Sequence, residues 1–166
     1  MNQPSVPPPT GTPPSSDRKI KIGFLIALAV AAAAVMYIQR RPPALPTNLN
    51  AMTDLSAALK LAAGENRNLA IFFLHSPPTE ADRKQIDALF KDSINERTLR
   101  EGRFVVVRVD VDTPQSPLAQ QYRIRTLPTL LALKPNGTEY NRCETFVSAV
   151  DFRSGFLTGA KSFAAP

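Results

Sequence analysis

The chain has 166 residues, of which 43% are hydrophobic, 20% are charged and 16 are prolines, and its formal net charge is +6. This length allows one domain with appendages. The single cysteine, Cys143, excludes an internal disulfide and a multi-cysteine metal site, and the single histidine, His75, argues against a zinc site, so we predict no metal and no cofactor.

Most of the positive charge lies near the N-terminus. Residues 1–43 contain five basic residues and one acidic residue, which accounts for four of the six net charges. These basic residues flank an apolar segment, whereas a nucleic-acid interface needs lysine and arginine clustered on a folded face among aromatic residues. We therefore predict no nucleic-acid partner.

The N-terminal region predicts a tail and a membrane anchor. Residues 1–18 are rich in proline and should be disordered. Residues 19–41 are predicted to form one transmembrane helix, because positions 22–38 carry no charge and span roughly 25 Å, close to a hydrocarbon core of about 30 Å. The alternative is a signal peptide cleaved near Ala32-x-Ala34. The apolar run continues past that point, which favours the anchor.

Basic residues lie on both sides of this apolar run, so the positive-inside rule hardly discriminates between the two orientations. We expect a single-pass membrane protein with its domain on the extracytoplasmic side. After signal cleavage the protein would instead be secreted or periplasmic. Residues 42–50 form a stiff Pro-rich linker to a domain at 51–159, and residues 160–166 form a C-terminal tail.

The domain alternates helical and strand-like segments. Thr53 is a candidate N-cap for a first helix that ends near Gly64. The run 104–110 is apolar on both faces, as in the centre of a parallel or mixed sheet. The other expected strands are 69–74, 129–133 and 139–146, and the later expected helices are 79–91, 93–99, 116–122 and 147–157.

One stretch organises the domain: Tyr122-Arg123-Ile124-Arg125-Thr126-Leu127-Pro128-Thr129. It follows a short helix and leads into a strand, a Pro-Asn-Gly turn and a last strand. This order resembles the thioredoxin family over roughly residues 51–159. The resemblance implies a three-layer α/β sandwich with a mixed central sheet and a cis Leu127–Pro128 bond. It also implies that Thr126 and Leu127 expose backbone groups to an extended peptide.

In thioredoxins, the strand that corresponds to residues 69–74 runs into a Cys-x-x-Cys loop, whose first thiolate attacks a substrate disulfide. Here the two cysteine positions fall near Ser76 and Thr79 in one register, or near Thr79 and Asp82 in another. Neither register contains a thiol, because Cys143 is the first cysteine of the chain. Dithiol exchange is therefore excluded by composition.

Another chemistry at this loop would use Ser76 or Thr79 as nucleophile and His75 as base. However, neighbouring residues at a strand end point in opposite directions, and a hydroxyl residue before acidic residues is typical of a helix cap. We predict no catalytic residue. Cys143 is interpreted as a buried structural thiol, or as an exposed thiol that cross-links two chains.

The leading hypothesis is a membrane-anchored, redox-inactive thioredoxin-like domain that binds a peptide or protein partner beside the cis-proline loop. Its oligomeric state is left open. The alternatives are an enzyme of the superfamily with non-thiol or single-thiol chemistry, and a purely structural scaffold. The predicted partner-binding residues are Thr126, Leu127, Pro128, His75, Ser76 and Thr79.

Overall fold

The computed structural model describes residues 17–40, 45–91, 93–161 and 163, so most of the predicted Pro-rich tail lies outside the described residues. The chain divides into two compact units, Met1–Gln39 and Arg40–Pro166. The described part of the first unit, residues 17–39, belongs to helix α1 (Asp17–Arg40). All other described elements belong to the second unit.

Helix α1 contains nearly all of the predicted membrane anchor, residues 19–41. Its described large apolar side chains are exposed, from 68% for Phe24 to 52% for Met36. Among the described residues, however, no helix is both long enough and apolar enough to cross a membrane. The predicted transmembrane helix is thus not confirmed, and the predicted localisation stays a prediction.

The second unit is built on a mixed four-stranded sheet with the strand order β2-β1-β3-β4. The central pair, β1 and β3, is antiparallel, whereas β1 and β2 are parallel. Strand β4 pairs antiparallel with β3. The strands are β1 (Leu69–His75), β2 (Val105–Val111), β3 (Thr129–Leu133) and β4 (Glu139–Cys143).

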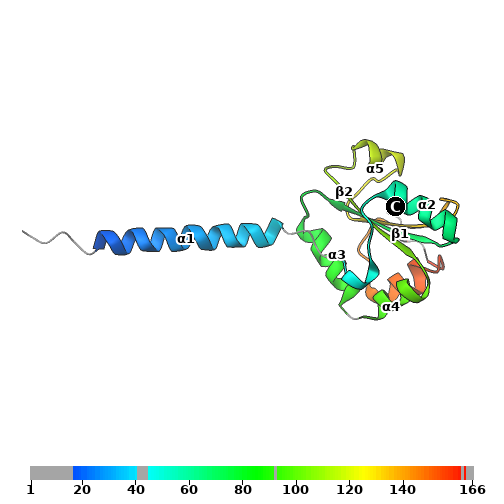
Figure 1. The fold of residues 1–166 in the computed structure, drawn as a ribbon, viewed down its shortest axis with the longest axis horizontal. Coiled ribbons are helices and arrows are strands. Elements are labelled where there is room, and N and C mark those ends of the chain that lie inside the picture. The colour runs from blue at the N-terminus through cyan, green and yellow to red at the C-terminus, as the bar shows by residue number, and fades with distance from the viewer. Residues whose placement is uncertain (1–16, 41–44, 92, 162, 164–166) are drawn as a thin grey trace, which may run out of the picture. The chain divides into compact units, whose positions relative to one another are not determined.

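Helices cover both faces of the sheet, which makes the three-layer sandwich that was predicted (Figure 1). Strand β1 serves both faces, because successive side chains of a strand point to opposite sides. Ile71 and Phe73 pack in one core, and Phe72 and Leu74 in the other. The first core includes α2 (Leu55–Glu65) and α5 (Pro117–Gln121), and the second includes α3 (Glu80–Phe90) and α4 (Ile94–Glu101).

The prediction that β2 occupies the centre of the sheet is wrong, because β2 is an edge strand. Its residues are nevertheless apolar on both faces, since Val106 packs in one core and Val107 in the other. Met52, which follows the short helix η1 (Thr47–Leu49), pairs with β2 and partly covers its open edge. There the Met52 N–H donates to the Val106 carbonyl at 2.9 Å, and the Met52 carbonyl accepts from the Arg108 N–H at 2.8 Å.

At the opposite edge, Phe163 pairs with the end of β4. The Glu144 N–H donates to the Phe163 carbonyl at 3.1 Å, and the Phe163 N–H donates to the Arg142 carbonyl at 3.3 Å. Strand β4 ends at Cys143 rather than at the predicted position 146. Residues 144–146 lie outside the ladder, and this position matters for the site below.

Two helix boundaries differ from the sequence prediction. Asp54, not Thr53, caps α2, and its Oδ1 accepts the Ala57 N–H at 3.0 Å. The predicted last helix is divided into α6 (Ala149–Asp151) and a π-helical turn, η2 (Phe152–Phe156). In this turn the Leu157 N–H reaches back to the Phe152 carbonyl at 2.8 Å.

Candidate functional site

The loop before β3 holds the first group of predicted site residues. The Leu127–Pro128 bond is cis, as the resemblance implied. The Thr129 hydroxyl donates to the Thr126 carbonyl at 2.6 Å, so this acceptor is already used. Among the described residues, the backbone N–H and C=O of Leu127 make no hydrogen bond. Of the two predicted backbone contacts, Leu127 is therefore the one whose N–H and C=O both lack a partner among the described residues.

A cleft of about 280 Å³ opens beside this loop. Phe146 is 55% exposed, which is unusual for so large an apolar side chain within the second unit. An exposed ring is of no special interest alone, but one that lines a cleft next to unpaired backbone makes this surface a candidate site. The lining residues are the apolar Ala81, Leu127, Pro128 and Phe146 and the polar Lys84, Gln85, Glu144 and Thr145.

Gln85 joins two walls of the cleft. Its side chain is buried, its Nε2 donates to the Val147 carbonyl at 3.1 Å, and its Oε1 accepts the Val147 N–H at 3.1 Å. The side-chain amide therefore pairs with the backbone of Val147 as a neighbouring strand would. This pair fixes the segment that carries Phe146 against helix α3.

Arg142 of β4 supports the loop from the other side. Its guanidinium donates to the carbonyls of Tyr122 at 2.7 Å and Arg123 at 3.0 Å, just before the cis-proline segment. It also forms ion pairs with Glu139 at 2.8 Å and Glu144 at 3.1 Å. Hydrogen bonding to Glu139 is the main reason why the pKa of Arg142 is raised. The charge of Glu144, which is almost fully buried, is thus balanced within the chain.

The second group of predicted site residues lies at the N-terminus of α3. Thr79 is the N-cap, and it forms a capping box with Asp82. The buried Asp82 carboxylate accepts the Thr79 N–H at 2.6 Å, the Thr79 hydroxyl at 2.7 Å and the His75 N–H at 3.2 Å. It also lies 3.0 Å from His75 Nδ1. Burial raises the pKa of Asp82, but the hydrogen bonds from Thr79 and His75 together outweigh burial and lower it.

An imidazole held through Nδ1 by a carboxylate can act as a base through Nε2. Here neither candidate nucleophile is arranged to use it. The Thr79 hydroxyl donates to Asp82, and the Ser76 hydroxyl makes no hydrogen bond with His75 or with any other described residue. The geometry therefore favours a structural role for the cluster: it closes the loop between β1 and α3.

Comparisons with known proteins decide the fold. No protein-family model matches the sequence, and no curated protein is significantly similar to it. Among solved structures, a thioredoxin from Thermus thermophilus is 28% identical over 61% of this chain and 80% of its own, with a TM-score of 0.51. A DsbH oxidoreductase is 19% identical over 74% of this chain and 90% of its own, with a TM-score of 0.55.

The oxidised C-terminal domain of Neisseria meningitidis DsbD is also similar, with 19% identity, a TM-score of 0.50, and coverage of 61% of this chain and 92% of its own. The fold is thioredoxin-like. In the thioredoxin-like domain, Thr79 and Asp82 occupy the helix start, which favours the second of the two registers considered above.

The cysteine of the thioredoxin-like domain is not placed for chemistry. Cys143 is 1% exposed, and its thiol donates to the Thr145 carbonyl at 3.0 Å. Burial raises its pKa. The thiolate is the reactive form of cysteine, so this thiol should be a poor nucleophile. Neither single-thiol catalysis nor a disulfide between chains is supported.

We predict that the full chain does not reduce insulin disulfides in the presence of dithiothreitol, because it lacks a dithiol and buries its one thiol. The turbidity of insulin reports the rate. The wild type and Cys143→Ser should both match the reaction without protein. A faster rate for the wild type than for Cys143→Ser would contradict the prediction.

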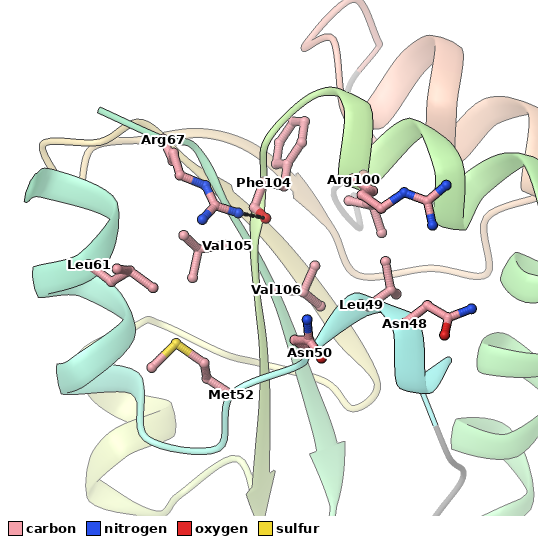
Figure 2. Close-up of a pocket in the computed structure, with 11 residues that line it drawn as sticks. Asn48, Leu49, Asn50, Met52, Leu61, Arg67, Arg100, Phe104, Val105 and Val106 are labelled. Carbon is pink, nitrogen blue, oxygen red and sulfur yellow. Dashed lines mark hydrogen bonds between the residues drawn. The ribbon is translucent and has the colours of Figure 1, made fainter. Parts of the chain in front are cut away.

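A second cavity, of about 300 Å³, lies at the β2 edge of the thioredoxin-like domain, between η1, α2 and α4 (Figure 2). Two of its polar side chains, Arg67 and Asn48, have partners within the chain. Arg67 donates to the carbonyls of Arg103 and Phe104, both at 2.8 Å, and Asn48 donates to Glu96 at 3.1 Å. This cavity therefore offers a ligand less than the cleft beside Pro128 does.

The structure brings some of the predicted site residues together and separates others. Leu127 and Pro128 line the cleft, whereas His75 and Thr79 belong to the Asp82 cluster. Ser76 belongs to neither group of side-chain contacts. Sequence reasoning missed the residues that α3 and the segment after β4 bring to the cleft. These are Ala81, Lys84, Gln85, Glu144, Thr145 and Phe146.

Proposed function

We propose that the thioredoxin-like domain binds an extended segment of a partner protein in the cleft beside Pro128, without dithiol chemistry. The observation that carries this proposal is the free backbone N–H and C=O of Leu127 at the edge of an apolar cleft. An extended chain can pair with such groups as an added strand does, while its side chains enter the neighbouring pocket.

The surroundings of the cleft support binding rather than catalysis. The cleft is lined by Phe146, whose ring is exposed, and its walls are fixed by Gln85 and Arg142. Preformed walls lower the entropy that a partner must lose on binding. A purely structural scaffold would be expected to fill this cleft with its own side chains, and it is open. The DsbH protein carries the name of an oxidoreductase, but the present chain has no cysteine pair.

Selection from a random peptide library on the immobilised full chain tests the proposal. We expect peptides that bind the wild type and lose at least about 30-fold in affinity for Phe146→Asp, because a central aromatic contact is typically worth 2 kcal/mol or more. Fluorescence anisotropy of labelled peptides gives the dissociation constants.

Val150→Asp is the matched control, since Val150 is 57% exposed but does not line the cleft. Peptides that survive Phe146→Asp and are lost on Val150→Asp would place binding on another surface. A selection that yields no binder would refute the proposal.

A further inference from the structure

The cleft beside Pro128 carries one unbalanced charge. Two charged side chains, Lys84 and Glu144, line it. Glu144 is 4% exposed and pairs with Arg142 at 3.1 Å, so its charge is already balanced. Lys84 is exposed and forms no ion pair with any described residue. Its ammonium group lies over the ring of Phe146, with Nζ 5.9 Å from the ring centroid.

Apart from the backbone of Leu127, the other polar groups that line the cleft have partners within the chain. Both ends of the Gln85 amide are bonded to Val147, and the Thr145 hydroxyl donates to the Phe163 carbonyl at 3.4 Å. A partner segment that enters the cleft therefore meets an apolar lining and a single available cation. A carboxylate is the side chain that complements such a cation.

The distance between the two features sets the spacing of the partner's side chains. In an extended chain, residues i and i+2 point to the same side and lie about 6.6 Å apart. The separation of the Lys84 ammonium and the Phe146 ring is 5.9 Å. Positions two apart in the partner can therefore place one side chain on the Phe146 ring and a carboxylate at the Lys84 ammonium. Adjacent positions cannot do this, because adjacent side chains point to opposite sides of an extended chain.

We propose that the cleft selects extended segments with a large apolar residue and an aspartate or glutamate two positions away. This specificity rests on the proposed function, since it concerns the same cleft. It assigns Lys84 as the residue that reads the acidic side chain, and Phe146 as the residue that holds the apolar one.

Four labelled nonapeptides of otherwise identical Ser/Gly sequence test the spacing and the charge on the full chain. Each peptide contains one leucine. The first carries glutamate two positions after the leucine, and the second carries glutamate two positions before it. The third carries glutamate next to the leucine, and the fourth carries lysine two positions after it. We expect the tighter of the two spaced glutamate peptides to bind about fivefold more strongly than either of the other two peptides, as for an exposed ion pair. High salt should reduce the preference.

Lys84→Glu should invert the preference between glutamate and lysine, and Lys84→Met should abolish it while keeping most of the apolar contact. Lys60→Glu is the matched control, because Lys60 is an exposed lysine on α2 that does not line the cleft. Equal binding of glutamate and lysine peptides to the wild type would overturn the specificity and leave the proposed function intact. An equal effect of Lys60→Glu and Lys84→Glu on the preference between glutamate and lysine peptides would likewise overturn the specificity and leave the proposed function intact. Failure of every peptide to bind would overturn both.

Discussion

Asp82→Ala is expected to lower the free energy of unfolding by about 3–5 kcal/mol, the loss typical when one partner of a buried charged network is removed. The carboxylate is fully buried and accepts hydrogen bonds from the backbone and side chains of Thr79 and His75. Without it, several donors at the start of α3 lose their acceptor. Chemical denaturation followed by circular dichroism measures the change.

Asp87→Ala on the same helix is the control, because Asp87 is exposed, and its effect should stay within about 0.5 kcal/mol. Asp82→Asn should fall between the two variants, since its amide NH₂ would face donors rather than acceptors. An Asp82→Ala protein as stable as Asp87→Ala would show that the cluster does not hold the loop.

The same carboxylate should make stability depend on acid. The folded-state pKa of Asp82 is lowered, so the unfolded chain binds more protons as the pH falls. Its contribution is therefore fully present above about pH 4, the usual value for an aspartate, and is lost as the pH falls through the folded-state pKa. Asp82→Asn should lose less stability on acidification than the wild type does.

Gln85→Met is expected to cost about 2–4 kcal/mol, because it leaves both the N–H and the C=O of Val147 unpaired in a buried position. The volume of the side chain is nearly kept, so the change isolates the lost hydrogen bonds. Thermal or chemical unfolding measures this loss. Gln121→Met, at an exposed position of α5, is the control and should have little effect.

The Gln85 variant should also weaken peptide binding about tenfold at temperatures where it remains folded, since Gln85 holds the segment that carries Phe146. A stability loss without any change in affinity would mean that this segment does not depend on Gln85 for its position in the cleft. Gln85 is thus a positioning residue rather than a contact for the peptide backbone.

The sequence predicted the layers of the fold well, because they depend on local patterns. The apolar run at β1 and the prolines and glycine around β3 set element type and order. The position of β2 was wrong for a physical reason. A covered edge strand and a central strand are both buried on their two faces, so an apolar pattern does not distinguish them. The pairing of Met52 with β2 is a tertiary contact that the sequence pattern does not predict.

The cleft was predicted only in part. Leu127 and Pro128 were found through the resemblance, because a proline at a strand start is a local signal. Phe146 was missed, since its segment continues the extended pattern of β4 in the sequence, whereas the pairing of β4 with β3 ends at Cys143. The signal for Asp82 was present, three residues after a hydroxyl cap, but its contact with His75 depends on how the loop folds back.

The most direct measurement is nuclear magnetic resonance of the isotope-labelled full chain titrated with a peptide from the selection. The predicted result is that the amide of Leu127 shifts most, together with residues 144–146 and Lys84, while the amides around Arg67 at the β2 edge stay unchanged. An unchanged Leu127 amide at saturating peptide, or shifts centred on the β2 edge, would contradict binding by the cleft beside Pro128.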